Sequence, residues 1–218
     1  CVVVVVVFVC VVVVLLEGGR GMFKKAAAVA FKGEQRLKGK DSKRLREAVA
    51  SLGGEEAAAA LLPAKADVLV RKAGGGSTVS FIFSDGECIL VQLDGRADIG
   101  EGEILPALQA FWKVGCAEAL LPCVIIQRPV ARFVFGGANV MAPGIHSVVP
   151  SRGGHLPAQG ALVAVRAIGN PAACAVGRLL LKPSSLVTGA KGEAVEVLHY
   201  FGDALWEACG GAGPEGFV

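Results

Sequence analysis

Histidine and paired cysteines are scarce in this sequence, and their scarcity excludes several kinds of site. The 218 residues include three histidines and seven cysteines. No two cysteines have the Cys-x-x-Cys spacing of a zinc ribbon, and their odd number argues against a disulfide framework. The histidines are scattered among cysteines and acidic residues without metal-ligand spacing. We therefore expect no metal site, and we expect free cysteines in apolar surroundings within a reducing compartment.

Motifs that mark common catalytic and nucleotide sites are also missing. Gly74-Gly75-Gly76 follows an expected strand, but no Gly-Lys-Ser/Thr follows it, so the run is not a P-loop. Ser184 and Ser185 have no nearby base that could activate a nucleophile. Aromatic residues make up only 6% of the chain, and we place Trp112 and Trp206 in the core. The sequence therefore predicts a protein without enzymatic activity and without a cofactor.

The first 21 residues differ from the rest of the chain. Residues 1–16 are almost pure valine, and the run is shorter than the ~20 residues that span a membrane. It has neither the basic start nor the convincing cleavage site of a signal peptide. Since the chain begins at Cys1 and Met22-Phe23-Lys24-Lys25 resembles a natural start, we expect residues 1–21 to lie outside the functional protein. A membrane anchor is the alternative, and we favour a cytoplasmic protein without a membrane partner.

Positive charge is concentrated in one segment. Residues 20–46 hold ten Lys or Arg and two acidic residues, whereas residues 47–218 hold twelve and sixteen. Such a basic segment is typical of a surface that binds a polyanion, although a solvated basic helix face would look the same. The predicted phosphate contacts are Lys38, Lys40, Lys43, Arg44 and Arg46.

Residues 22–128 are predicted to form a small domain in which helices pack on an antiparallel sheet. A helix should follow the cap at Asp41-Ser42 and end at Gly53-Gly54, and a second should run from Glu55 to Leu62 and be stopped by Pro63. A third should begin near Pro106. Asp85-Gly86 is a hairpin signal. The expected strands are 26–31, 67–72, 78–84 and 87–93.

Residues 129–207 are predicted to form a small β-barrel, because short strands alternate with glycine turns. The expected strands are 130–135, 160–167, 172–181 and 194–201, with a helical turn at 183–186. His199 should be structural, whereas His146 and His155 should be exposed in loops. Residues 208–218 are Gly-rich and are read as a tail or linker.

The run from Phe133 to Ile145 is the most informative stretch. A strand is expected to end at Gly136-Gly137, followed by a short helical turn over Ala138–Met141 and a stop at Pro143-Gly144. This pattern resembles the signature of the PUA domain, an RNA-binding pseudo-barrel whose members bind RNA at this corner. The resemblance implies that this corner is an RNA surface. The alternative is that Gly137 serves only the turn. Met141 and Ile145 are candidates for the core. The implied RNA-binding residues are Gly136, Gly137, Ala138, Asn139, Pro143 and Gly144.

The whole of residues 22–207 resembles the ligatin family, eukaryotic translation initiation factor 2D, and the shorter malignant T-cell-amplified protein family. The carrying motifs are the Lys38-Gly39-Lys40-Asp41 run, the PUA-like corner and the Gly169-Asn170-Pro171 turn. The resemblance implies an α+β fold in which the helix-on-sheet domain precedes the PUA barrel.

The same resemblance implies a non-enzymatic translation factor on the small ribosomal subunit. Such factors bind rRNA, place or release tRNA without GTP, and act in reinitiation and recycling. A separate partner resembling density-regulated protein is implied if no carboxy-terminal domains follow. The alternative is an accessory RNA-binding module of an RNA-modification enzyme, although residues 22–128 lack a catalytic motif.

Overall fold

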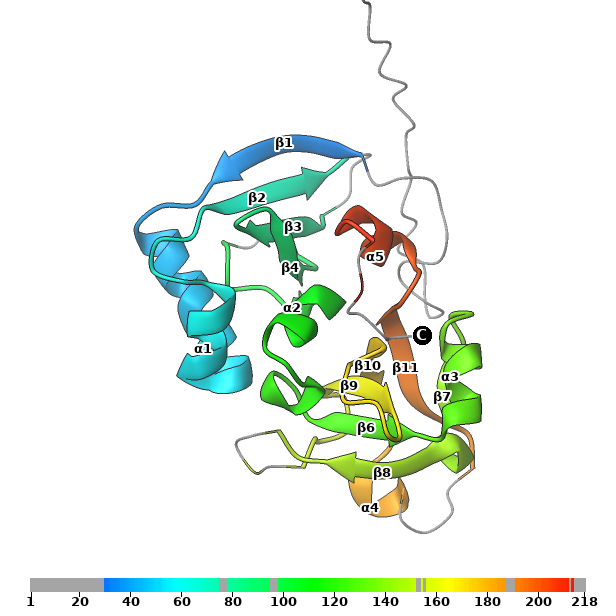
Figure 1. Cartoon of the computed structure of the whole chain (residues 1–218). Helices are drawn as coiled ribbons and strands as arrows, with labels where there is room; N and C mark the ends of the chain where they lie inside the picture. Colours follow the sequence, from blue (N-terminus) through cyan, green and yellow to red (C-terminus); the bar gives the residue numbers. More distant parts are fainter. Residues whose placement is uncertain are drawn as a thin grey trace, which may run out of the picture.

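The protein is built from two sheets that lie side by side (Figure 1). The structure is a computed structural model and describes residues 30–74, 78–94, 98–151, 154, 156–186, 191–211 and 213. The valine-rich leader, the proposed start at Met22 and His155 lie outside these residues, as does most of the Gly-rich tail. Within the described ranges, no helix is both long and apolar enough to cross a bilayer.

The first sheet is antiparallel throughout and follows chain order, β1-β2-β3-β4-β5. Every residue of β3 is buried, so this strand is covered on both faces. The strands and helices of this half are β1 (Phe31–Arg36), α1 (Lys40–Leu61), β2 (Val68–Ala73), β3 (Ser80–Ser84), β4 (Glu87–Gln92), β5 (Ile104–Pro106) and α2 (Leu108–Lys113).

The hairpin between β3 and β4 forms as predicted. Asp85 has a φ of 51° and Gly86 a φ of 87°. Two successive positive φ angles define the tight turn whose twist suits a two-residue hairpin, and Asp-Gly is a favoured pair for it.

The predicted helix break at Gly53-Gly54 is present as a kink within α1. Gly54 has a φ of 80° and a ψ of 175°, which is not helical. The helix begins without a side-chain cap, so the predicted cap at Asp41-Ser42 is wrong; Asp41 lies in the first turn instead, where a carboxylate favours the helix dipole. Leu45, Val49 and Leu61 are fully buried in the core cluster that also contains residues of β2, β3 and β4.

Two boundaries in the first half differ from the prediction. The first strand continues to Arg36 instead of ending at residue 31, so it includes residues that the sequence alone places in the basic segment. Residues 26–29 of the predicted strand lie outside the described residues. Pro106 lies in β5, and the helix begins at Leu108. Both errors arise because the strands gain hydrogen bonds from neighbours that are distant in sequence.

The second sheet has the order β7-β11-β10-β9-β6-β8. Its two edge strands, β7 and β8, are consecutive in the chain and are joined by a single 3₁₀ turn at Ala142–Gly144. This connection curls the sheet into a half-barrel, and the predicted α+β fold with a PUA-type barrel is confirmed. The elements are β6 (Cys123–Ile126), α3 (Arg128–Val134), β7 (Val140–Met141), β8 (Ile145–Val149), β9 (Leu162–Ala167), β10 (Ala175–Leu179), α4 (Pro183–Leu186), β11 (Glu193–Tyr200) and α5 (Ala204–Ala208).

The predicted strand at 130–135 is wrong, because this segment forms α3. Pro129 lies in the first turn of the helix, where the missing N–H of proline leaves no hydrogen bond unmade. Val134 is fully buried whereas Phe133 is 53% exposed. A short, mostly apolar run of six residues does not distinguish a strand from a short helix, and here the tertiary contacts select the helix.

The second sheet begins one strand earlier than the sequence predicts. Cys123–Ile126 pairs in parallel with β9 and antiparallel with β8. This strand lies ahead of Pro129, the predicted start of the second domain. It escapes prediction because Cys-Val-Ile-Ile is a short apolar run that also suits the end of the preceding domain.

A buried histidine connects the two halves. The backbone N–H of Leu108 donates to Nε2 of His199 over 3.3 Å, and Nδ1 of His199 lies 2.8 Å from Oδ2 of Asp203. Since Nε2 accepts, the ring hydrogen resides on Nδ1 and is donated to the carboxylate. His199 and Asp203 are fully buried, which confirms the structural role predicted for His199.

Candidate RNA-binding groove

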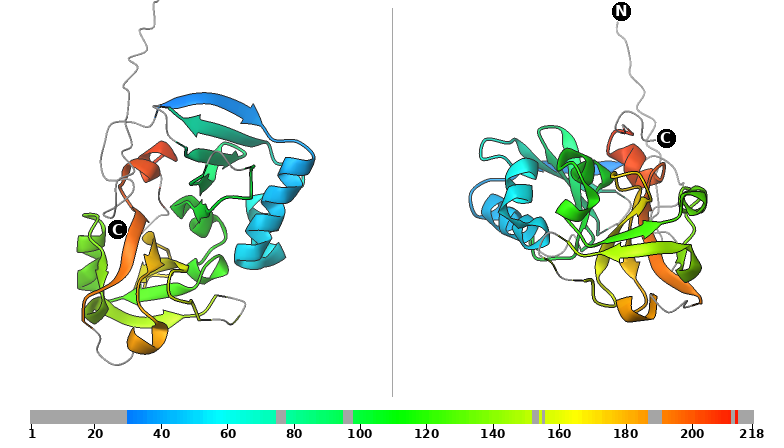
Figure 2. Two further views of the ribbon diagram at one scale, coloured as in Figure 1. Left: turned by 180° about the vertical axis from the view of Figure 1, so that it is seen from behind. Right: turned by 60° about the horizontal axis from the view of Figure 1, so that its bottom comes forward.

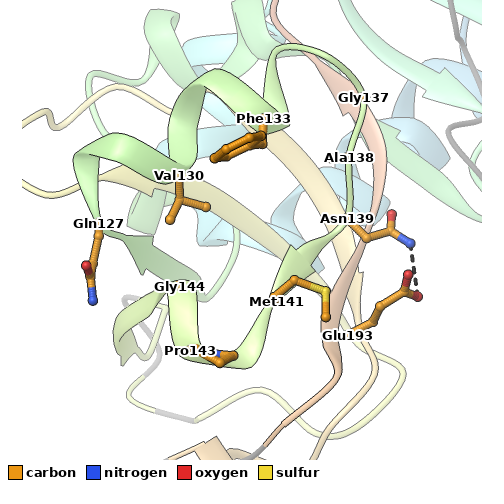
Figure 3. A pocket seen from close by; sticks show the side chains of 10 residues that line it. All are labelled: Gln127, Val130, Phe133, Gly137, Ala138, Asn139, Met141, Pro143, Gly144 and Glu193. Carbon is orange, nitrogen blue, oxygen red and sulfur yellow. Dashed lines mark hydrogen bonds between the residues drawn. The ribbon is translucent and has the colours of Figure 1, made fainter.

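A groove with a volume of about 740 Å³ opens beside α3 in the second half (Figure 3). It is built where the chain leaves β6, turns through α3 and returns through β7 and the 3₁₀ turn. Glu193 at the start of β11 completes its wall. The lining residues are Gln127, Val130, Phe133, Gly137, Ala138, Asn139, Met141, Pro143, Gly144 and Glu193.

Five of the six predicted corner residues meet in this groove. Gly137, Ala138, Asn139, Pro143 and Gly144 all line it. The sixth, Gly136, is exposed in the turn after α3 but is not part of the lining. The structure thus brings the predicted corner together even though the local secondary structure differs from the prediction.

Gly137 is required by both the turn and the packing. Its φ is +78°, a left-handed conformation that favours glycine. A Cβ atom at this position would lie 2.9 Å from the hydroxyl oxygen of Tyr200 on β11. Burial, and to a lesser extent Asp203, raises the pKa of Tyr200, so its hydroxyl stays protonated at neutral pH.

Asn139 is anchored by two hydrogen bonds to β11. Its Oδ1 accepts from the backbone N–H of Val197 over 3.0 Å, and its Nδ2 donates to Oε2 of Glu193 over 3.2 Å. The dashed line in Figure 3 marks the second of these bonds. The side chain therefore stabilises the corner, a role that the sequence alone does not predict.

Apolar side chains border the groove. Phe133 is 53% exposed and Met141 is 46% exposed, so the predicted core position of Met141 is wrong. Ile145 is partly buried against the core of the second sheet. The guanidinium of Arg132 lies 4.7 Å from the centre of the Phe133 ring. Exposed aromatic surface of this kind is typical of sites that stack bases.

The predicted phosphate contacts in the basic segment divide into two groups. Lys38, Lys40 and Lys43 are exposed, and Lys43 pairs only with the exposed Glu47 over 3.8 Å. Lys38 and Lys40 make no ion pair with any residue that the structure describes. These three exposed lysines form the basic surface.

The two arginines of the same segment are engaged within the fold. Arg44 lies 2.8 Å from Asp98 and 3.2 Å from Glu101, and its side chain is only 23% exposed. The hydrogen bond to Asp98 is the main cause that raises the pKa of Arg44. Arg46 donates to the carbonyl oxygen of Leu62 over 3.0 Å. Both side chains are thus held by neighbouring groups of the protein itself.

The groove and the basic surface do not form one continuous site. Figure 1 places α1 on the left of the molecule and α3 on the lower right, and the reversed view in Figure 2 agrees. An RNA that contacts both surfaces must therefore reach across the molecule.

Sequence reasoning missed Glu193 and Phe133 as groove residues. Glu193 is distant from the corner in sequence, and no local motif announces that β11 pairs with β7. Phe133 falls in a predicted strand, so its outward orientation on α3 could not be foreseen. Among the described residues, no group of His, Cys, Asp or Glu could hold a metal ion.

Comparison with known proteins agrees with this geometry. A family model described as the PUA domain of eIF2D matches residues 121–204. Eukaryotic translation initiation factor 2D of Rattus norvegicus is 34% identical over 194 residues, which cover 86% of this chain and 31% of the relative. The chain thus spans less than a third of that relative's length.

A shorter relative is matched over most of its length. Translation machinery-associated protein 20 of Saccharomyces cerevisiae is 30% identical over 151 residues, which cover 67% of this chain and 75% of the relative. A PUA domain of Aeropyrum pernix, solved as a tartrate complex, is similar in structure with a TM-score of 0.64 and 26% identity, over 81% of this chain and 90% of that one.

These similarities confirm the resemblance seen in the Lys-Gly-Lys-Asp run and the PUA-like corner. They extend over both sheets of the structure rather than over the barrel alone. The chain therefore belongs to the family of PUA-domain proteins that contains eukaryotic translation initiation factor 2D and translation machinery-associated protein 20.

Proposed function

We propose that this chain is a non-enzymatic, RNA-binding translation factor that acts on the small ribosomal subunit in the cytoplasm. The observation that carries the proposal is the groove, whose lining includes five residues of the PUA-like corner. Membership in a family whose relatives are named as translation factors supports the same role.

The two surfaces suit two different RNA contacts. The lysines at positions 38, 40 and 43 can neutralise phosphates, which contributes affinity without reading sequence. The groove holds apolar and polar side chains that can contact a base. Because the surfaces lie apart (Figure 1), the protein can contact two RNA segments at once, such as rRNA and tRNA.

The activity we propose, from the family resemblance, is GTP-independent placement or release of tRNA during reinitiation and recycling. Apart from RNA, the partner we propose is a protein resembling density-regulated protein, for a chain to which no further carboxy-terminal domains are joined.

Sedimentation with purified small ribosomal subunits tests the proposal. Ala138 is exposed and lines the groove, so Ala138→Glu introduces a negative charge that repels the backbone of an RNA whose base enters the groove. We expect this variant to bind subunits at least about tenfold more weakly, because it places like charges side by side and a loss of ~1.4 kcal/mol already corresponds to a factor of ten. Ala60→Glu, at an exposed position on α1, is the matched control and should bind normally. Normal binding by Ala138→Glu would show that the groove is not the RNA surface.

A further inference from the structure

We propose that the groove binds an unpaired nucleobase that carries an exocyclic amino group, and that the carboxylate of Glu193 accepts a hydrogen bond from that group. The inference rests on the proposed RNA-binding function and adds to it the chemical class of the ligand. It makes Glu193 a specificity-determining residue.

The charge of the lining favours a base over a phosphate. None of the groove residues is Lys or Arg, and Glu193 is the charged one among them. A phosphate in the groove would face this carboxylate without a compensating cation. Arg132 lies over the Phe133 ring at the border of the groove, where a sugar-phosphate backbone could pass while its base enters.

The apolar part of the lining suits the flat face of a base. Phe133 and Met141 are both about half exposed, and Val130 lies beside Phe133 in Figure 3. Base–aromatic stacking does not depend strongly on sequence. The apolar side chains therefore contribute affinity, and discrimination must come from the polar groups.

The Glu193 carboxylate is held in place by Asn139. The N–H of Val197 donates to Oδ1 of Asn139, and this bond orients the amide so that Nδ2 faces Glu193. Nδ2 then donates to Oε2 of Glu193. The other oxygen, Oε1, has no hydrogen-bond partner among the residues described. An oriented acceptor is thus left available to a ligand in the groove.

An ionised carboxylate accepts hydrogen bonds and cannot donate them. Cytosine and adenine present an amino donor at N4 and N6, and guanine presents one at N2. Uracil presents a carbonyl oxygen at the position of the cytosine amino group, and this oxygen would be repelled by the carboxylate. The groove should therefore discriminate against uracil.

Fluorescence anisotropy with labelled oligo(rC), oligo(rA) and oligo(rU) tests the inference on the full chain. We expect the wild-type protein to bind oligo(rC) or oligo(rA) at least about fivefold more tightly than oligo(rU). In Glu193→Gln the amide can still accept from Asn139 but can also donate to uracil. This variant should bind oligo(rU) more tightly, so that the preference falls to about one.

Phe133→Ala is the matched variant in the same groove. Because stacking is tolerant of base identity, it should weaken binding of the three oligonucleotides by a similar factor and leave the preference intact. Thermal melting of each variant confirms that the fold is retained.

The outcomes separate the inference from the function on which it rests. Equal wild-type affinity for the three oligonucleotides would overturn the inference while leaving RNA binding in place. A preference that persists in Glu193→Gln would overturn the role of Glu193. Failure of the wild-type protein to bind any oligonucleotide or subunit would overturn the proposed function, and the inference with it.

Discussion

Gly137 packs so closely on Tyr200 that a Cβ atom at position 137 would lie 2.9 Å from the Tyr200 hydroxyl oxygen. The corner after α3 is therefore shaped by a strand more than sixty residues away in sequence. A charge placed at Gly137 would disturb this packing as well as any bound phosphate, so Gly137→Asp cannot separate folding from RNA binding.

Replacing Gly137 should instead report on packing. We expect Gly137→Ala to destabilise the protein by about 2–4 kcal/mol, because the positive φ and the contact with Tyr200 both oppose a side chain. Gly202 has a φ of +87°, and a Cβ atom added there would meet no atom within 4 Å, so Gly202→Ala should lose only about 1 kcal/mol. Urea unfolding measures both. Equal losses of unfolding free energy in the two variants would show that the Tyr200 side chain moves aside for the added Cβ atom without cost.

Asn139→Ala should lower stability as well as RNA binding. It removes the acceptor for the Val197 N–H and the donor to Glu193, and we expect a loss of about 1–2 kcal/mol. Asn139 is therefore part of the fold as well as part of the groove. Gln127 lines the same groove and is exposed, so Gln127→Ala is the control and should melt like wild type. Unchanged melting of Asn139→Ala would contradict the anchoring role.

Within the basic segment, Lys38 and Lys40 should contribute to RNA binding, whereas the ion-paired Arg44 should contribute to stability. Lys38→Ala and Lys40→Ala should each flatten the log–log salt dependence of RNA binding by roughly 0.7–0.9 and leave unfolding unchanged. Arg44→Ala should leave the salt dependence unchanged and lower the free energy of unfolding, because Arg44 bridges Asp98 and Glu101. Binding isotherms across a salt series together with urea unfolding distinguish them. If the lysine variants keep the wild-type slope, these residues form only a solvated face.

The His199–Asp203 pair should be important for joining the two halves. His199→Ala leaves the Leu108 N–H and the Asp203 carboxylate without their partner, and we expect a loss of about 2–4 kcal/mol. His146 is exposed, so His146→Ala serves as the control with little effect. Urea unfolding followed by tryptophan fluorescence measures the difference. A loss below about 1 kcal/mol for His199→Ala would contradict the role of the pair.

Alkaline pH should destabilise the protein through Cys174. Burial raises the pKa of this thiol from 9.0 to about 12. Between these values the unfolded chain ionises while the folded chain keeps its proton, so stability is complete below pH 9 and falls as pH rises, by up to about 1.4 kcal/mol per pH unit. Cys174→Ala should flatten this decline relative to Cys116→Ala, whose thiol is partly exposed. An identical decline in both variants would exclude Cys174 as its source.

The local turn motifs in the sequence determined where several elements of the fold end. The Asp85-Gly86 hairpin, the break at Gly54 and the helical turn at Pro183 appear where the sequence predicts them, because each depends on the local φ preferences of a few residues. The corner residues and the family could be identified for the same reason, since their motif is contiguous in the chain.

Tertiary structure decided what the sequence left open. The apolar run Phe133–Phe135 suits a strand, yet α3 extends to Val134 and buries this side chain in the core of the second sheet. Asn139 has the chemistry of an RNA contact, but pairing of β11 with β7 places Val197 and Glu193 within its reach. Arg44 has the charge of a phosphate contact, but a loop more than fifty residues away supplies its partners. Residue types and local turns can be read from the chain alone. The partners of a polar side chain depend on strand pairing between distant segments, which the burial of the whole core selects.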